Sequence, residues 1–345
     1  MKDKLSFSAL EIERTSVPDA KEVTRSGYDY VSWGIGNRFP QDLYDMYQNS
    51  AILQSVINGT ADYVFGGGVI SAFEVVNDRY ETLDDIIKKC VFDYLIFGGF
   101  AIQLMYKGGK VEAMYWLDFQ KCRRNEDQTK VYYSDDWGKY AKKALEYNSW
   151  TPGTDKGTCI YYYKGHKTRG IYPVPMYVGA LKSVKISTEI SNFHLNNIVK
   201  GFASNAIISF NNGEPDEDTK AKINKDIREM FCGTDNAGTF LLLFNESKEN
   251  ACEIAKIQDD KFDLKYAALS KSVKEDIFIA FRATPTLFGL PNENNGFSKQ
   301  EYLESFELYN KTVVTPIQKD FERAFRSMGF VIKFRTFQLE DTENV

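Results

Sequence analysis

The sequence has few of the residues on which metal centres and disulfide frameworks depend. Its five cysteines include no C-x-x-C pair, and its two histidines, His166 and His194, have no partner at ligand spacing. This pattern disfavours a zinc site and a disulfide framework, whereas an odd number of reduced thiols fits a cytosol-like compartment. We therefore expect no metal and no cofactor, and we expect structural roles for both histidines.

Nucleotide-binding and membrane-spanning signatures are also missing. The sequence has no G-x-x-x-x-G-K-[ST] loop, and Gly66–Gly68 lacks the spacing of a dinucleotide fingerprint, so a tight turn is the better interpretation. The longest apolar stretch, Cys90–Tyr106, contains Asp93 and Gln103 and is shorter than the ~20 residues of a membrane helix. Residues 1–16 have no continuous apolar core, so we expect neither a membrane span nor a secretion signal.

The charge balance argues against a protein that grips nucleic acid. With 43 basic and 48 acidic residues the net charge is −5, whereas proteins that neutralise many phosphates carry a basic excess. Aromatic residues are abundant instead, with 25 Phe, 21 Tyr and 4 Trp, which indicates wide buried faces in cores or subunit interfaces. The length of 345 residues predicts roughly two domains.

The N-terminal half predicts one domain of mixed helices and strands. Apolar residues at helical spacing predict a helix over 41–64, and a second helical stretch covers 81–104 with an interruption at Gly98-Gly99. The turn Lys107-Gly-Gly-Lys110 separates two runs of strand-forming residues, and further short runs of this kind fill 130–172.

Two long helices are predicted in the second half of the chain. Residues 176–200 contain no proline and place apolar residues on two sides, which indicates a helix with more than one neighbour. Residues 260–283 predict another helix, whose apolar seam has spacings of three and four: Phe262, Tyr266, Leu269, Val273, Ile277 and Ala280.

The segment between these helices predicts a small acidic insert. Runs of strand-forming residues at 206–210 and 239–244 flank a charged helix at 218–230. Residues 201–260 hold twelve acidic and six basic residues, a net charge of −6. A solvated surface is the simplest interpretation of this charge.

The C-terminal region begins with a loop and continues with a long helix. Prolines, glycines and asparagines over 285–297 predict no regular structure, and Ser298-Lys-Gln-Glu301 forms a capping box at the start of the helix. Pro316 falls inside the helical pattern, where it removes a backbone hydrogen bond and clashes with the Thr312 carbonyl, so we expect a kink. Residues 330–339 predict a final strand.

The order of these elements resembles the portal proteins of tailed bacteriophages. The likeness spans roughly residues 33–338, and three sets of stretches carry it: Trp33-Gly-Ile-Gly-Asn-Arg-Phe-Pro40 with Asp62-Tyr-Val-Phe-Gly-Gly-Gly68; Gly170-Ile-Tyr-Pro-Val-Pro175 with Asn211-Asn-Gly213; and Ile279-Ala-Phe-Arg-Ala-Thr-Pro-Thr-Leu-Phe-Gly289 with Phe297-Ser298 and Val314-Thr-Pro316.

The resemblance implies an α+β portal fold with a helical crown that is minimal or absent. Its parts would be an N-terminal arm (1–37), a wing (38–175 and 299–339), two stem helices (176–200 and 260–283), a clip (201–259), a tunnel loop (284–298) and an acidic tail (340–345).

The resemblance also implies roles for particular residues. The tunnel loop would face DNA in the channel through Asn292, Glu293, Asn294, Asn295 and Gly296, with Lys299 as a cation near the phosphates. The clip would dock the packaging motor and tail adaptors through Glu214, Asp216, Glu217 and Asp218. Pro316 would kink the last helix. For the asparagines, ordinary turn chemistry is an equally good interpretation.

The family further implies the assembly and its partners. Members form a homo-oligomeric ring, expected to have twelve subunits, at one vertex of the virion, and double-stranded DNA passes through it without sequence preference. The partners would be a terminase ATPase, the major capsid protein and tail adaptor proteins, with assembly in the host cytoplasm and no membrane. A net acidic ring suits this role because like charge discourages tight phosphate contacts. The portal itself would not be an enzyme.

Two other functions remain open at this point. One is a monomeric α/β nucleic-acid-processing enzyme whose carboxylates converge only in the fold. The sequence contains the adjacent pairs Asp84-Asp85, Asp135-Asp136 and Asp259-Asp260, but neighbours in sequence do not face each other, and helix starts or solvated faces explain them more simply. The other is a general interaction protein with a helical hairpin.

Overall fold

The computed structural model describes residues 17–24, 27–70, 74–138, 143–165, 169–199, 206–210, 218–219, 222, 240–244, 262–290, 298–335 and 337. The chain divides into two compact units, which are described in turn. Unit 1 comprises residues 1–185 and 275–345, and unit 2 comprises residues 186–274. Both contain helix and strand, so the α+β class expected from the sequence is confirmed.

Unit 1 begins with two short paired strands and two helices. Strand β1 (Glu22–Thr24) pairs antiparallel with β2 (Val31–Trp33), and helices α1 (Phe39–Asn49) and α2 (Ala51–Phe65) follow. The single helix expected over 41–64 is therefore wrong. The chain breaks at Ser50, whose extended backbone lets its hydroxyl accept a hydrogen bond from the Leu53 amide and cap α2.

The next helix, α3 (Leu83–Phe97), has explicit start and stop signals. Thr82 and Asp85 form a capping box, which gives the Asp84-Asp85 pair the helix-start role expected for it. The helix ends at Gly98, whose φ of 86° is left-handed. A Cβ at this position would lie 2.4 Å from the Val174 carbonyl oxygen, so only glycine fits. The interruption expected at Gly98-Gly99 is confirmed, and the residues after it form a strand.

A six-stranded sheet forms the largest part of unit 1, in the order β5-β4-β9-β8-β7-β6. Its strands are β4 (Gly99–Lys107), β5 (Lys110–Leu117), β6 (Cys122–Arg124), β7 (Lys130–Tyr133), β8 (Leu145–Ser149) and β9 (Gly157–Lys164). The hairpin expected around Lys107–Lys110 is confirmed as β4 and β5. All neighbours are antiparallel except β8 and β9, which run parallel.

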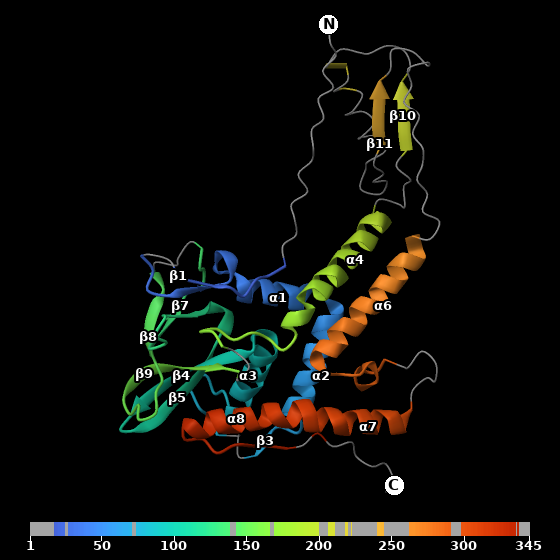
Figure 1. Ribbon diagram of the computed structural model, residues 1–345. Coiled ribbons are helices and arrows are strands. Elements are labelled where there is room, and N and C mark those ends of the chain that lie inside the picture. Colours follow the sequence, from blue (N-terminus) through green and yellow to red (C-terminus); the bar gives the residue numbers. More distant parts are fainter. Residues whose placement is uncertain are drawn as a thin grey trace. The chain divides into compact units, whose positions relative to one another are not determined.

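Aromatic rings join this sheet to helices from both ends of the chain. Phe100 on β4 stacks on Tyr163 of β9 and on Phe321 of the C-terminal helix α8 (Thr315–Ser327), each at 4.9 Å between ring centroids. Tyr94 on α3 contacts the same Phe321 ring at 5.7 Å. The abundance of aromatics in the sequence therefore fills a core between α3, the sheet and α8 (Figure 1).

A buried arginine on β6 contacts the Trp33–Pro40 stretch. Arg123 on β6 is fully buried, and all its guanidinium donors are used: Nε on Asn37 Oδ1 (2.5 Å), and the terminal nitrogens on Asn37 O, Gln41 Oε1, Gln120 O and Cys122 O. Its guanidinium also lies 5.7 Å from the centre of the Trp33 ring. Burial lowers the pKa of Arg123 to about 10. This side chain ties the N-terminal segment to the sheet.

The helices expected over 176–200 and 260–283 form with shifted ends. Helix α4 (Leu181–Val199) begins five residues later than expected, after a 3-10 turn at Val178–Ala180. The reason is Tyr177, which is fully buried and donates its hydroxyl to the Ile96 carbonyl oxygen at 2.9 Å, so the chain before it is held on the core of unit 1. Helix α6 spans Phe262–Phe281.

Unit 2 contains the remainder of these helices and a two-stranded sheet. Strands β10 (Ala206–Phe210) and β11 (Phe240–Phe244) confirm the two expected runs and pair in parallel. Phe193 of α4 stacks on Tyr266 of α6 at 5.0 Å between centroids. Leu195 and Leu269, which the sequence placed on buried faces, are 59% and 42% exposed, so the apolar pattern overstates what unit 2 buries.

The C-terminal region of unit 1 is a segmented helix. Helix α7 (Lys299–Tyr309) leads through a π-helical turn (Asn310–Val314) into α8. After α8, strand β12 (Lys333–Phe334) pairs antiparallel with β3 (Val69–Ile70). The long strand expected over 330–339 is wrong in its first part, because the chain before Lys333 is not in a strand.

Candidate functional site

The structure describes only some of the residues predicted for the channel and the clip. Asn292, Glu293, Asn294, Asn295 and Gly296 lie outside the described residues, as do Glu214, Asp216 and Glu217. Lys299 is the first residue of α7 and is exposed. Asp218 is helical and exposed. Pro316 is the second residue of α8.

The first part of the predicted tunnel loop (284–298) is folded onto α2. Residues Pro285–Phe288 form a 3-10 helix, so the expectation of no regular structure over 285–297 is wrong at its start. Proline at the first helical position fixes φ for this turn, and Gly289 closes it with a φ of 73°. Leu287 is buried, and its carbonyl oxygen accepts a hydrogen bond of 2.6 Å from the Tyr63 hydroxyl.

The last residue of the predicted loop, Ser298, and the first turn of α7 are held by the same group of contacts. Ser298 caps α7 by accepting from the Glu301 amide at 3.3 Å, which is one half of the expected capping box. The Glu301 carboxylate accepts from the Thr286 hydroxyl at 3.5 Å. One turn into the helix, the Tyr302 hydroxyl lies 3.0 Å from that of Tyr63. Tyr63 therefore contacts both borders of the loop 291–297.

Tyr63 belongs to a cluster that binds α2 to the C-terminal region. Its ring contacts those of Phe288, Phe306, Tyr309 and Phe337 at centroid distances between 5.2 and 6.1 Å. The Tyr309 hydroxyl lies 2.8 Å from that of Thr60, and burial raises the pKa of Tyr309 to about 12. Burial and the Tyr302 hydroxyl likewise raise the pKa of Tyr63. The phenols therefore stay neutral hydrogen-bonding groups.

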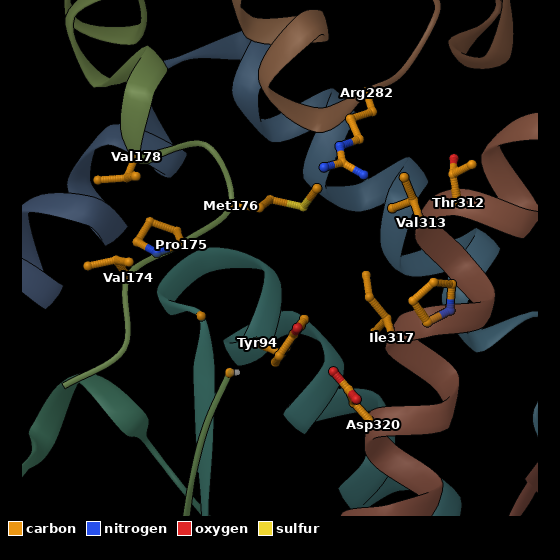
Figure 2. A pocket seen from close by; sticks show the side chains of 13 residues that line it. Tyr94, Val174, Pro175, Met176, Val178, Arg282, Thr312, Val313, Ile317 and Asp320 are labelled. Carbon is orange, nitrogen blue, oxygen red and sulfur yellow. The ribbon is translucent and has the colours of Figure 1, made fainter. Parts of the chain in front are cut away.

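A cavity of about 370 Å³ lies where α3, the segment before α4, the end of α6 and the π-helical turn meet. Its apolar walls are Val174, Pro175, Met176, Val313, Pro316 and Ile317. Figure 2 shows Arg282 on one side of this space, Tyr94 and Asp320 on the other, and Met176 extending into it.

The polar groups of the cavity come from two ends of unit 1. Burial, and then the charge of Asp320, raise the pKa of Tyr94 to about 12. Arg282 follows the last residue of α6 and has a φ of 55°, a left-handed conformation that is costly for a residue with a Cβ. Its guanidinium has no hydrogen-bond or ion-pair partner within the described part of the chain.

A π-helical turn lies immediately before Pro316, the residue at which we predict a kink. Proline has no amide hydrogen to donate to the Thr312 carbonyl, and the turn immediately before it widens. The Thr312 hydroxyl donates to the Leu308 carbonyl oxygen at 2.8 Å. How far the helix axis bends here stays a prediction.

Sequence reasoning missed Tyr63 and Arg282. Tyr63 was one apolar residue among several in a helical pattern, and its partner Leu287 lies 224 positions away along the chain. Arg282 was only part of the stretch leading to Pro285. Its left-handed backbone conformation depends on contacts with distant parts of the chain, and the local sequence pattern does not predict it.

The contacts of Tyr63 join the described residues on both sides of 291–297 to α2. Within the described ranges, no three His, Cys, Asp or Glu side chains gather as a metal site would require. Nor does any helix in that part of the chain have the length and apolar character needed to cross a membrane.

Comparisons with known proteins find likeness in fold. No family model matches the chain, and no curated protein matches it. A chain of the "virion of native gene transfer agent (GTA) particle" has 10% identity and a TM-score of 0.54, covering 88% of this chain and 85% of that one. A chain of the "neck of empty GTA particle computed with C6 symmetry" has 10% identity and a TM-score of 0.54, covering 88% and 86%. A chain of the "neck of native GTA particle computed with C12 symmetry" has 14% identity and a TM-score of 0.48, covering 93% and 88%. The chain thus shares its fold, over most of its length, with chains of GTA particles.

Proposed function

We propose that the chain is a portal protein, the subunit of a ring at one vertex of a phage-like particle through which double-stranded DNA enters and leaves. The observation that carries the proposal is the fold shared with a chain of a C6-symmetric GTA neck over 88% of this sequence. The order of sequence stretches that resembles portal proteins supports it independently, because that resemblance lies in the sequence and not in the fold.

The anchoring of the loop 291–297 fits a channel element. A loop that faces moving DNA must be fixed at its base, because otherwise the passing duplex would displace it. Both borders of this loop are bound to α2 through Tyr63, by the bond to Leu287 and the contact with Tyr302. The proposal assigns Asn292, Glu293, Asn294, Asn295 and Gly296 to the channel lining, with Lys299 near the phosphates.

The charge of the chain supports passage over binding. A ring whose subunits each carry −5 repels phosphate at long range, and neutral amides in the loop offer weak contacts without sequence preference. In this proposal Glu214, Asp216, Glu217 and Asp218 lie on the clip and receive the terminase ATPase and later the tail adaptors. The force comes from that ATPase, so the chain needs no catalytic residues.

The oligomeric mass of the purified chain tests the proposal. Twelve subunits of 39.5 kDa give about 474 kDa, which mass photometry separates clearly from a monomer. We expect a closed oligomer under at least some ionic conditions. A chain that stays monomeric in every salt, and in extracts that assemble particles, would contradict the proposal.

Charge changes test the individual assignments. Replacing Asn292, Asn294 and Asn295 with lysine should slow DNA passage most at low salt, since added cations bind phosphates. Glu214→Lys with Asp216→Lys should weaken docking of the motor. Unchanged motor affinity would favour the solvated-surface interpretation of the acidic insert.

A further inference from the structure

An exposed tyrosine is held rigidly at the N-terminal end of α3. Tyr80 is 83% exposed and has a φ of 59°. Asn77 fixes the turn, because its side-chain oxygen accepts from the amides of Arg79 and Glu81, and its carbonyl accepts from the Tyr80 amide. The Asn77 amide group also donates to the Met114 carbonyl oxygen at 3.0 Å, so the turn is bound to β5.

This arrangement is unfavourable for the isolated subunit. A left-handed backbone is costly for a tyrosine, and full exposure of its ring gains no burial in return. Asparagine or glycine would adopt the same conformation with less strain. Strained residues that surrounding structure holds in place are concentrated at functional sites, and tyrosine is among the residues that dominate binding energies. The turn therefore has the features of a preformed contact.

The cavity described above lies at the other end of α3, where Tyr94 and Gly98 line it. At 1.5 Å per residue, the 15 residues of α3 separate the two features by about 22 Å. A volume of about 370 Å³ has room for an aromatic ring. Met176 and Pro316 offer apolar contacts to such a ring, and Asp320 can accept a hydrogen bond from a phenol.

We propose that Tyr80 of one subunit inserts into this cavity of the next subunit, which makes the two features the knob and the socket of a repeating head-to-tail contact. The inference rests on the proposed function, since it assumes a ring. Contacts of this kind need two different, complementary surfaces on each subunit, and rotation then closes the ring. A knob and a socket at opposite ends of one rigid helix meet that requirement.

Charge complementarity supports a second copy as the occupant. The socket holds the guanidinium of Arg282, which has no ion-pair partner among the described residues, whereas its carboxylate, Asp320, pairs with Arg323 at 3.9 Å. Carboxylates lie near the knob in the chain, since Asp78 on the turn and Glu74 just before it are both exposed. Arg79 offsets one of these two charges, because its guanidinium lies 5.4 Å from the centre of the Tyr115 ring, whose hydroxyl donates to Asp78 at 2.8 Å. The knob therefore keeps a net negative charge. In the proposed contact, the net negative knob lies near the cationic Arg282 of the next subunit.

The backbone of Tyr80 provides a test that separates assembly from folding. Tyr80→Gly relieves the left-handed strain, so the monomer should unfold at the same or a higher temperature. The affinity between subunits, measured from ring formation by mass photometry, should fall at least tenfold. Leu145→Ala, at a 58% exposed position on β8, is the matched control and should assemble normally. If Tyr80→Gly subunits form rings with the same affinity as wild-type subunits, the proposal is overturned.

Photo-cross-linking locates the contact directly. The full chain with p-benzoylphenylalanine at position 80 is irradiated after assembly, and the cross-linked peptides are identified by mass spectrometry. We expect a cross-link between subunits to Met176 or Ile317. Rings that cross-link at another surface would overturn the socket while leaving the ring in place. A chain that forms no ring before irradiation would overturn both proposals.

Discussion

The anchoring role of Tyr63 leads to a quantitative prediction for Tyr63→Phe. The substitution keeps the ring and its contacts but removes the hydroxyl that donates to the Leu287 carbonyl oxygen at 2.6 Å. A net hydrogen bond is worth about 1 kcal/mol, and a buried carbonyl left without a donor costs a further ~1–3 kcal/mol. Leu287 is 5% exposed, so water replaces the lost donor poorly. We expect a loss of about 2 kcal/mol in the free energy of unfolding.

Urea denaturation followed by tryptophan fluorescence measures this loss. The four tryptophans, Trp33, Trp116, Trp137 and Trp150, all belong to unit 1, which also contains Tyr63 and Leu287. The matched control is Tyr47→Phe, which removes a 2.8 Å bond to Asn58 from a less buried hydroxyl on α1 and should cost under about 1 kcal/mol. Equal losses in the two variants would refute the argument that Tyr63 is a special anchor.

Three further predictions concern unit 1. Asp93 is buried and accepts from the Trp116 indole at 2.7 Å, and burial raises its pKa well above the usual range. The folded state then keeps a proton that the unfolded state loses above pH ~4, so stability falls as the pH rises from there through the raised pKa. In urea denaturation at pH 5 to 9, Asp93→Asn should show a smaller fall in the free energy of unfolding. Parallel plots of that free energy against pH for the two proteins would contradict this. Gly98→Ala places a Cβ 2.4 Å from the Val174 carbonyl oxygen and should cost roughly 3 kcal/mol by urea denaturation. Gly27→Ala has a similar φ of 85°, but no atom of the described residues lies within 4 Å of its Cβ, so a cost as large as that of Gly98→Ala would rule out the clash as the cause. Pro316→Ala restores an amide donor for the Thr312 carbonyl, so the free energy of unfolding should stay unchanged or rise by about 1 kcal/mol, while DNA packaging should fall. Packaging equal to that of the wild type would show that the π-helical turn has no mechanical role.

The sequence predicts an element well where the residues that start or end it are close to one another along the chain. The Ser298 cap, the glycines at 98 and 99 and the Lys107–Lys110 turn each act within a few residues, and the structure confirms them. The break at Ser50 had a signal of the same kind, since serine is a favoured helix cap, but the apolar periodicity on both sides of it indicated a continuous helix.

The errors arose where distant contacts decide the structure. Helix α4 begins late because Tyr177 is bound to Ile96 of α3, and the 3-10 helix at Pro285–Phe288 is held by Tyr63. Neither contact can be read from its own segment. The candidate site is predicted as residues of a loop, whereas the described structure shows the contacts of the residues on either side of 291–297 and a separate cavity. Both are assembled from segments more than a hundred residues apart.

The central claim is that copies of this chain close into a ring around an axial channel. Single-particle electron microscopy of the purified full chain tests it most directly. The account predicts end-on views of a closed ring with an axial hole wide enough for a DNA duplex, and a reconstruction in which residues 292–296 of every subunit face that hole. Particles without a hole, or a ring whose hole is lined by another part of the chain, would contradict it.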